Sequence, residues 1–186
     1  MGATYYKLQD GGHVAYLPAF TGKKFYASHF YHKYWWSVDP IPAEYRSRGA
    51  EGTEEFLDLL NTSLIVTHDL RWIHYCALRN KKYKKVFDAG RFKGFKRQAT
   101  GYFLKGSGEI KESKEGFLVK PKDEETILRF RYLPKLKTNS SEAIISPHHA
   151  FDEGLGVGRK RKFEFINLKV SKDLINKGEW IKIGYF

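Results

Sequence analysis

The hydrophobic pattern of the first forty residues predicts a β-hairpin followed by a helix. Two short strand-like runs, residues 3–9 and 13–18, flank an Asp-Gly-Gly sequence, which is typical of a tight turn because glycine accepts a positive φ. In residues 21–38, aromatic and histidine side chains recur at spacings of three and four, as on one face of a helix. The Asp-Pro at residues 39–40 is expected to end this helix.

The next part of the chain predicts a loop and two helices. Residues 40–52 contain two Pro and two Gly, which is typical of a loop. Thr53 is the expected N-cap of a helix, because two glutamates follow it in the first turn, where the helix dipole favours acids. Leucines and a phenylalanine at positions 56–64 supply its buried stripe. A further helix is predicted from near Thr67 through the lysines that end at position 85, with a pair of strands as the alternative.

After about residue 86 the pattern becomes typical of β-strands. Short segments rich in Phe, Tyr, Ile and Val are separated by Gly, Pro or charged turns. Leu128 and Phe130 alternate with Arg129 and Arg131, which predicts a strand with one buried face and one basic face. The predicted strands cover residues 100–106, 115–121, 126–134, 162–170 and 178–186.

Three local signals complete the fold prediction. The apolar phase shifts between Phe165 and Ile166, which indicates a β-bulge or a strand buried on both faces. Ser171 and Gly178 bracket a short helical segment as cap and stop. Residues 134–162 predict a long irregular loop, basic and glycine-rich towards its end. We therefore expect one α+β domain over residues 1–186, with an N-terminal hairpin and two or three helices packed on a mostly antiparallel C-terminal sheet.

Charge and aromatic content narrow the choice of partner. Lys and Arg number 33 against 21 Asp and Glu, a formal net charge of +12, and aromatic residues make up 16% of the chain. This excess attracts polyanions, and nucleic acid is favoured over an acidic protein. One cysteine excludes a disulfide framework, and no apolar run suits a signal peptide or a membrane span. We expect no membrane association and an intracellular location, in the cytoplasm or with the nucleoid or nucleus.

Residues 79–97, "RNKKYKKVFDAGRFKGFKR", are the densest basic–aromatic segment. Nine of the nineteen positions are Lys or Arg. Cations contact phosphates, and aromatic rings stack on unpaired bases, so the segment favours RNA or single-stranded DNA. The predicted phosphate contacts are Lys81, Lys82, Lys84, Lys85, Arg91, Lys93, Lys96, Arg97, Arg129, Arg131, Arg159, Lys160, Arg161 and Lys162. The predicted stacking residues are Phe92 and Phe95.

The segment "GLGVGRKRKFEF" at residues 154–165 combines alternating glycines with four consecutive cations. Glycines let a backbone approach a phosphate closely, and exposed amides with arginine can hold it. The spacing is that of neither a P-loop nor a Rossmann motif. Over about a dozen residues it resembles the glycine-rich loop of CRISPR RNA-processing endonucleases, although Phe163-Glu164-Phe165 replaces that family's second glycine pair. The resemblance implies that the following strand contacts RNA.

The sequence is compatible with two catalytic alternatives. Metal-free RNA cleavage needs a base and a cation, and His29 and His149 are the histidines considered for it. A metal-dependent nuclease would instead use Asp88, Glu109 and Lys111, which match the D…ExK pattern of restriction-type enzymes, with Mg²⁺ as cofactor. Without that pattern no cofactor is expected. A third alternative is a basic subunit that docks on an acidic protein in a larger assembly.

Overall fold

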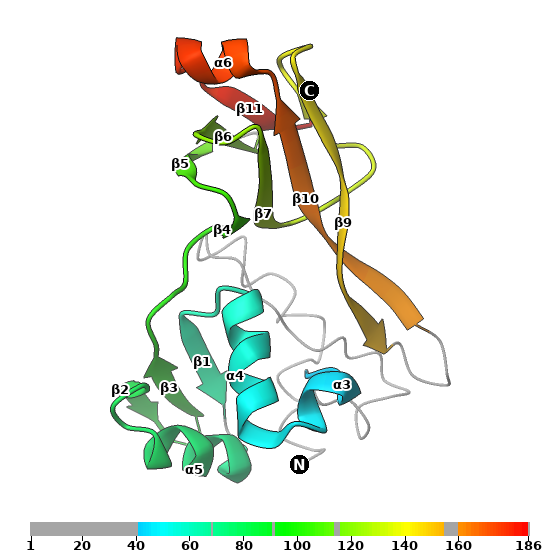
Figure 1. The fold of residues 1–186 in the computed structure, drawn as a ribbon. Helices are drawn as coiled ribbons and strands as arrows, with labels where there is room; N and C mark the ends of the chain where they lie inside the picture. The colour runs from blue at the N-terminus through cyan, green and yellow to red at the C-terminus, as the bar shows by residue number, and fades with distance from the viewer. Residues whose placement is uncertain (1–40, 68, 91, 114–115, 155–159, 186) are drawn as a thin grey trace.

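The computed structural model describes residues 41–67, 69–90, 92–113, 116–154 and 160–185 (Figure 1). The predicted hairpin at residues 3–18 and the predicted helix at residues 21–38 lie outside them. The described chain combines helices with antiparallel sheets, so the α+β class is confirmed. Among the described residues, no helix is both long and apolar enough to cross a membrane.

Helices and a small sheet form the lower half of the view in Figure 1. The sheet has the order β1-β3-β2, with both pairs antiparallel. Its core contains Leu57, Cys76, Tyr83 and Phe95, so helices α4 and α5 bury one side of the sheet. The elements are α3 (Ala43–Arg46), α4 (Gly49–Leu59), β1 (Leu64–Thr67), α5 (Leu70–Leu78), β2 (Lys84–Ala89) and β3 (Phe92–Lys96).

The predicted loop over residues 40–52 is wrong, because α3 and the first turn of α4 lie within it. Thr53 is not an N-cap: its hydroxyl donates to the Gly49 carbonyl at 2.9 Å, one turn inside the helix. Tyr45 packs on Phe56 with ring centroids 5.2 Å apart, and this tertiary contact accounts for helical structure in a Pro- and Gly-rich stretch.

Helix α5 is shorter than predicted. Its N-cap is Asp69, whose carboxylate accepts from the Arg71 backbone N–H at 2.9 Å. The helix ends at Leu78, so the lysines that were expected on it lie in the following turn and in β2. Lys84 and Lys85 therefore lie on a strand of the small sheet and not on a helix.

The C-terminal half forms two four-stranded sheets instead of the single predicted sheet. Their orders are β4-β7-β10-β9 and β5-β6-β11-β8. Leu128, Ile166, Val119 and Ile183 are among the residues that fill one shared core. The elements are β4 (Phe103–Lys105), β5 (Gly108–Ser113), β6 (Gly116–Pro121), β7 (Glu125–Arg131), β8 (Lys137–Thr138), β9 (Ala143–Gly154), β10 (Lys160–Val170), α6 (Lys172–Lys177) and β11 (Ile181–Gly184).

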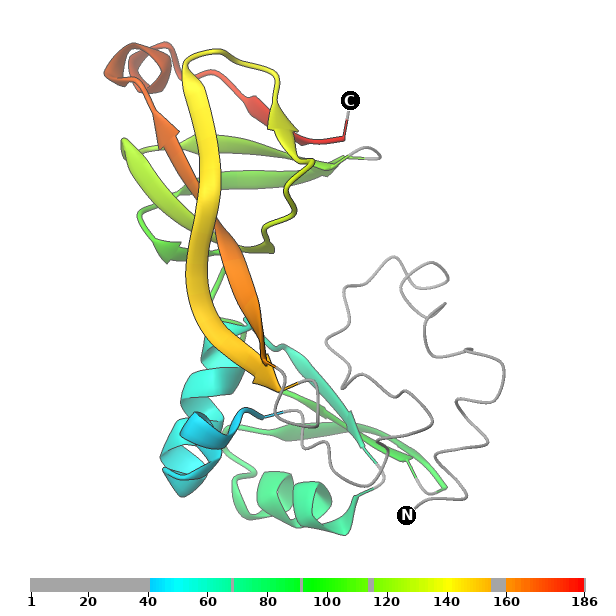
Figure 2. The ribbon, with the colours of Figure 1, turned by 90° about the vertical axis from the view of Figure 1, so that its right-hand side faces the viewer.

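The predicted irregular loop at residues 134–162 is also wrong. Strands β9 and β10 pair along their whole length, from Ala143 opposite Val170 to Gly154 opposite Lys160. Pro147 is compatible with β9 because this strand lies at the edge of its sheet. The paired strands β9 and β10 run from the α6 end of the molecule to α3 (Figures 1 and 2).

The predicted phase shift in β10 is confirmed. The pairing of β10 with β7 shifts register between Phe165 and Ile166, and both side chains are fully buried. Phe165 packs in a cluster with Phe56 of α4 and Phe151 of β9, whereas Ile166 packs in the core between the two sheets. The shift therefore lets one strand contribute to two cores.

The predicted short helix after β10 is confirmed as α6. The Ser171 hydroxyl caps it by accepting from the Leu174 N–H at 3.1 Å. Gly178 ends it in the left-handed conformation with φ 64°. The chain then turns directly into β11, whose Ile181 and Ile183 point into the core.

Candidate nucleic-acid interface

One face of the β1–β3–β2 sheet carries exposed cations and apolar side chains together. Leu64 lies opposite Lys96, which in turn lies opposite Lys84. Val66 lies opposite Gly94, which lies opposite Phe87. Because directly opposed residues share a face, these positions form one surface. The open sheet face is defined here as Leu64, Val66, Lys84, Phe87 and Lys96.

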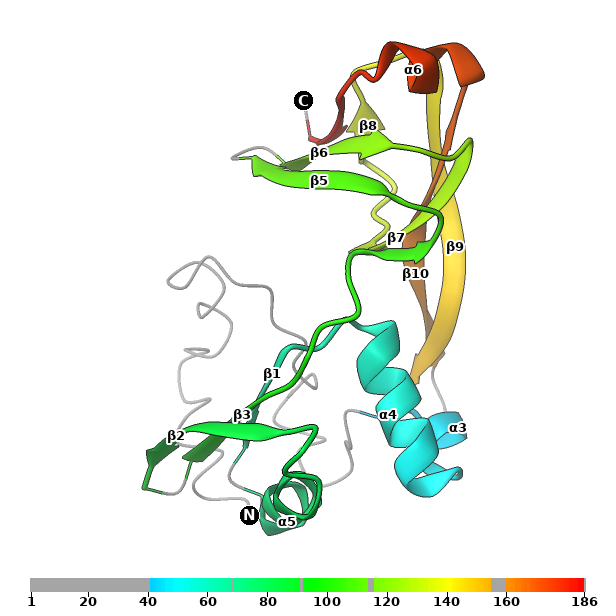
Figure 3. The ribbon, with the colours of Figure 1, turned by 60° about the vertical axis from the view of Figure 1, so that its left-hand side comes forward.

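The other face of this sheet is covered by helices. Ile65 and Phe95 point towards the α4–α5 side, and Phe95 is 4% exposed. Helix α5 lies below the sheet in Figures 1 and 3. On the open sheet face, Leu64 and Val66 keep 47% and 49% exposure, and Phe87 keeps 39%. The alternation along β1 and β3 therefore separates a buried face from an accessible one.

Phe87 lies at the middle of the open sheet face. A Cβ added to Gly94 would stand 2.1 Å from Phe87 Cε1, so the ring lies directly over the Gly94 backbone. A register shift between Lys85 and Phe87 brings the ring to this position. Because Gly94 has no side chain, the Phe87 ring can lie against the backbone of β3.

Lys84 and Lys96 are neighbours across the β2–β3 pair. Both are exposed, and neither forms an ion pair with an acidic residue in the described part of the chain. Like charges placed opposite each other destabilise a sheet, and a bound anion relieves that repulsion. The pair is therefore a favourable place for a phosphate beside the Phe87 ring.

The other lysines of residues 79–97, except Lys81, pair with carboxylates. Lys85 contacts Asp88 at 3.2 Å, and Lys93 also pairs with Asp88, on the face opposite to Phe87. Lys82 pairs with Glu54 at 2.5 Å. Of the predicted phosphate contacts in this segment, Lys81, Lys84 and Lys96 are exposed and form no ion pair with an acidic side chain among the described residues.

Phe95 and Arg97 do not suit the roles predicted for them. Phe95 lies in the core, where no base can reach its ring. The Arg97 side chain is 1% exposed, pairs with Asp58 and lies 3.5 Å from Glu54. Arg97 therefore fastens the end of β3 to α4, and a phosphate could reach it only after these carboxylates moved.

Glu54 connects several elements beneath the sheet. Its Oε1 accepts from the hydroxyls of Tyr75 at 2.6 Å and Tyr83 at 2.5 Å. Burial acts to raise the pKa of the Glu54 carboxyl, but hydrogen bonds from Lys82, Tyr75 and Tyr83 outweigh it and hold the pKa below its ordinary value. Burial and the Glu54 carboxylate in turn raise the pKa of Tyr83. This network is structural, since it ties α5 and the turn after it to α4.

The predicted basic face of β7 is largely engaged within the protein. Arg129 donates from Nη1 to the Gly101 carbonyl at 2.6 Å, and burial lowers the pKa of its guanidinium. The Arg131 guanidinium lies 5.1 Å from the centroid of the Phe163 ring.

The remaining predicted contacts lie elsewhere in the chain. Lys162 is exposed on β10, and Phe92 is half-buried on β3. Arg91 and Arg159 lie outside the described residues, and Lys160 and Arg161 are described as the first backbone positions of β10.

The residues of the metal-dependent alternative are not brought together. Asp88 lies on β2, whereas Glu109 and Lys111 lie on β5 in a different sheet, in the upper half of Figures 1 and 3. Within the described residues, no group of three or more His, Cys, Asp or Glu side chains is placed to hold a metal ion. His149 is exposed on β9 with Nε2 3.7 Å from Asp152 Oδ1, and His29 lies outside the described residues.

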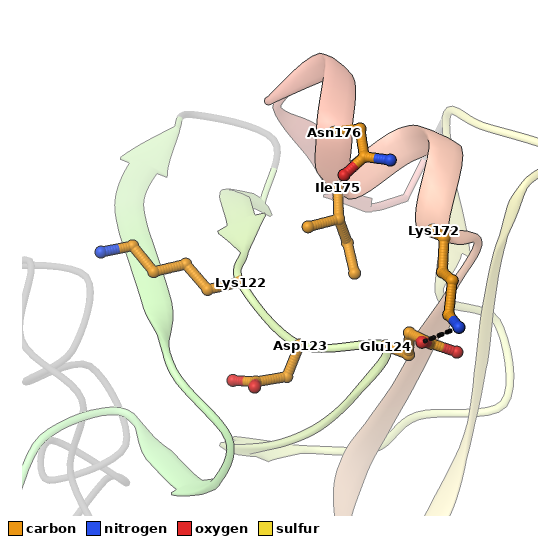
Figure 4. A pocket seen from close by; sticks show the side chains of 6 residues that line it. All are labelled: Lys122, Asp123, Glu124, Lys172, Ile175 and Asn176. Atoms are coloured by element: carbon orange, nitrogen blue, oxygen red, sulfur yellow. Dashed lines mark ion pairs between the residues drawn. The ribbon is translucent and has the colours of Figure 1, made fainter.

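A depression between the β6–β7 turn and α6 has mixed charge (Figure 4). It measures about 310 Å³, and its Lys172 and Glu124 form an ion pair at 3.4 Å. The remaining lining residues are Lys122, Asp123, Ile175 and Asn176. Two cations beside two acids give no preference for a polyanion, so this depression is a poorer candidate than the open sheet face.

Phe87 is the functional candidate that the sequence did not single out. The sequence pattern does not identify it, because the register shift between Lys85 and Phe87 changes the face of the sheet on which Phe87 lies. Lys84 and Lys96 were predicted and are brought together. Comparison of the chain with protein-family models, with curated protein sequences and with solved structures gave no match.

Proposed function

We propose that the protein binds single-stranded nucleic acid, RNA or DNA, on the open sheet face. The observation that carries the proposal is the exposed Phe87 ring, placed over Gly94 one row away from the Lys84–Lys96 pair. The ring offers a flat apolar surface for a base, and the two ammonium groups offer contacts for the adjoining phosphate. Val66 and Leu64 extend the apolar surface on the β1 side.

The arrangement favours a single strand over a duplex. In a duplex the base faces are stacked on each other and are not available to a protein ring, whereas an unpaired base can stack on Phe87. Stacking on an aromatic side chain is worth about 1–3 kcal/mol per base. The formal net charge of +12 adds long-range attraction that does not depend on sequence.

Binding of labelled oligonucleotides at several salt concentrations tests the proposal. Phe87→Ala is expected to weaken binding by about 1–3 kcal/mol, because it removes the stacking surface. Lys84→Gln with Lys96→Gln is expected to lower the slope of log K against log salt by about 0.7 per lysine. Neither change is expected to unfold the protein, since all three side chains are exposed.

Lys177→Gln is the matched control. Lys177 is an exposed cation on α6, far along the chain and paired with Glu142 at 3.6 Å. It changes the net charge by the same amount as either single lysine variant but leaves the open sheet face intact. Absence of binding at low salt, or equal losses in the Lys84, Lys96 and Lys177 variants, would reject the proposal.

A further inference from the structure

A second surface with cations around an aromatic ring lies on the outer side of the β5–β6–β11 strands. Ile110, Val119 and Ile181 point inward to the core between the sheets. Their neighbours along each strand therefore point outward. Lys111 lies opposite Leu118, and Leu118 lies opposite Lys182.

Trp180 adds an indole ring to this surface. It directly precedes Ile181, so it lies on the outer side, and it is partly exposed. The Lys111 ammonium lies 4.3 Å from the centroid of the Trp180 ring. Lys120 lies beside Gly178, two residues before Trp180. Its Nζ is 3.3 Å from the position that a Cβ on Gly178 would occupy. The outer β5–β6–β11 face is defined here as Lys111, Leu118, Lys120, Trp180 and Lys182.

Among the described residues, lysines outnumber acids on this face. Lys111 and Lys120 lie beside Trp180 and Gly178, and the strand pairing places Glu109 opposite Lys120. Cations around an aromatic ring match a phosphate attached to an unpaired base. The open sheet face has the same combination, built in another sheet from other strands.

We infer that the outer β5–β6–β11 face binds a second segment of the same single strand, with one base on Trp180. This inference rests on the proposed function, since it gives the strand a second contact. A phosphate next to the ring attracts the Lys111 ammonium, and a base then occupies the indole face that Lys111 covers. The exchange is favourable because an exposed cation–π contact is weaker than stacking of a base on an aromatic ring.

Two separate faces predict a dependence on strand length. A strand of roughly four nucleotides contacts one face at a time, whereas a strand of roughly twenty nucleotides can contact both. The second contact is then intramolecular, so the longer strand binds more than about tenfold tighter than the shorter one. Trp180→Ala and Phe87→Ala are each expected to remove most of this gain.

The test uses the full chain labelled with 5-fluorotryptophan and observed by ¹⁹F NMR. Trp180→Phe identifies the resonance of Trp180, and oligouridylate and oligothymidylate of the short length are the probes. The Trp180 resonance is expected to shift on titration in the unmodified chain and equally in Phe87→Ala. Lys120→Gln is expected to weaken that shift, and Lys169→Gln on β10, in the other sheet, is the charge-matched control that leaves it unchanged.

The outcomes separate this inference from the proposed function. A Trp180 resonance that stays fixed while Phe87→Ala weakens binding overturns the second face and leaves the open sheet face standing. A shift at Trp180 with no effect of Phe87→Ala supports the second face and overturns the first. Failure of every probe to bind at low salt overturns both.

Discussion

The ring of Phe87 occupies the space that a side chain on Gly94 would need, since a Cβ there would stand 2.1 Å from Phe87 Cε1. Phe87 belongs to β2 and Gly94 to β3, and the two residues are direct partners in the sheet. Phe87 therefore lies against the backbone of β3 and is 39% exposed, at the centre of a face that also carries Lys84 and Lys96.

Gly94→Ala is expected to weaken binding of single-stranded oligonucleotides several-fold. The new methyl group displaces the ring of Phe87, which is free to rotate towards solvent, so the platform moves away from the lysines. Thermal unfolding is expected to change little, because alanine in place of a strand glycine offsets the lost contact by roughly 0.5–1 kcal/mol. Oligonucleotide affinity and melting temperature, measured on the same preparation, check the result. A full loss of stability would show instead that the contact holds the sheet together.

Phe95→Ala is expected to behave in the opposite way to Phe87→Ala. Phe95 is 4% exposed and packs with Leu57, Cys76 and Tyr83, so its truncation leaves a cavity and costs about 3–5 kcal/mol of unfolding free energy. Phe87→Ala removes a partly exposed ring and is expected to cost much less. Urea unfolding of both variants measures the contrast. Similar destabilisation by the two changes would contradict the assignment of the two rings to opposite faces.

The contrast between these rings shows what the sequence could and could not tell about the site. Phe92 and Phe95 are three residues apart, and in a regular strand an odd spacing places them on opposite faces, so they cannot form one platform. The lysines at 84 and 96 were predicted correctly as exposed cations. Phe87 lies on the same face as these lysines because of the register shift between Lys85 and Phe87. That shift is set by contacts with β3 and not by the local sequence pattern.

The fold also combines locally encoded features with features that depend on distant parts of the chain. The α+β class, the α6 capping residues and the shift at Phe165 and Ile166 were predictable, because each depends on neighbours in the sequence. Strand β9 was not, since Pro147 interrupts its apolar pattern and its structure depends on pairing with β10. The two separate sheets were equally hidden, because strand order is decided by partners far along the chain.

Arg97→Met is expected to lower the unfolding free energy by about 2 kcal/mol, because it removes a buried guanidinium that donates to a partly exposed carboxylate. Its guanidinium is 1% exposed and faces Asp58 and Glu54, so the change leaves two carboxylates at the base of the sheet without this cation. The denaturation midpoint in urea is the measurement, with Lys81→Met in the adjacent exposed turn as the control. Reduced oligonucleotide affinity at unchanged stability would instead assign Arg97 to the binding surface.

Acid is expected to weaken the Glu54 network. Hydrogen bonds from Lys82, Tyr75 and Tyr83, opposed by burial, hold the pKa of Glu54 below its ordinary value in the folded chain. In the unfolded chain that pKa returns to about 4.3. The carboxylate therefore contributes its full stabilisation above the unfolded pKa, and the contribution is lost as pH falls through the lower, folded pKa.

Glu54→Gln isolates this contribution, because other carboxylates with lowered pKa, such as Glu142 beside Ser171, act in the same direction. The variant keeps an oxygen that can accept from Tyr75 and Tyr83 but loses the charge that pairs with Lys82. It is expected to be less stable than the unmodified chain at neutral pH. The difference in unfolding free energy is expected to shrink as the pH falls below the pKa of free glutamate. Urea midpoints of both chains across the acid range measure this convergence. A difference that stays constant with pH would show that the stabilisation comes from the hydrogen-bonding geometry of the side chain and not from its charge.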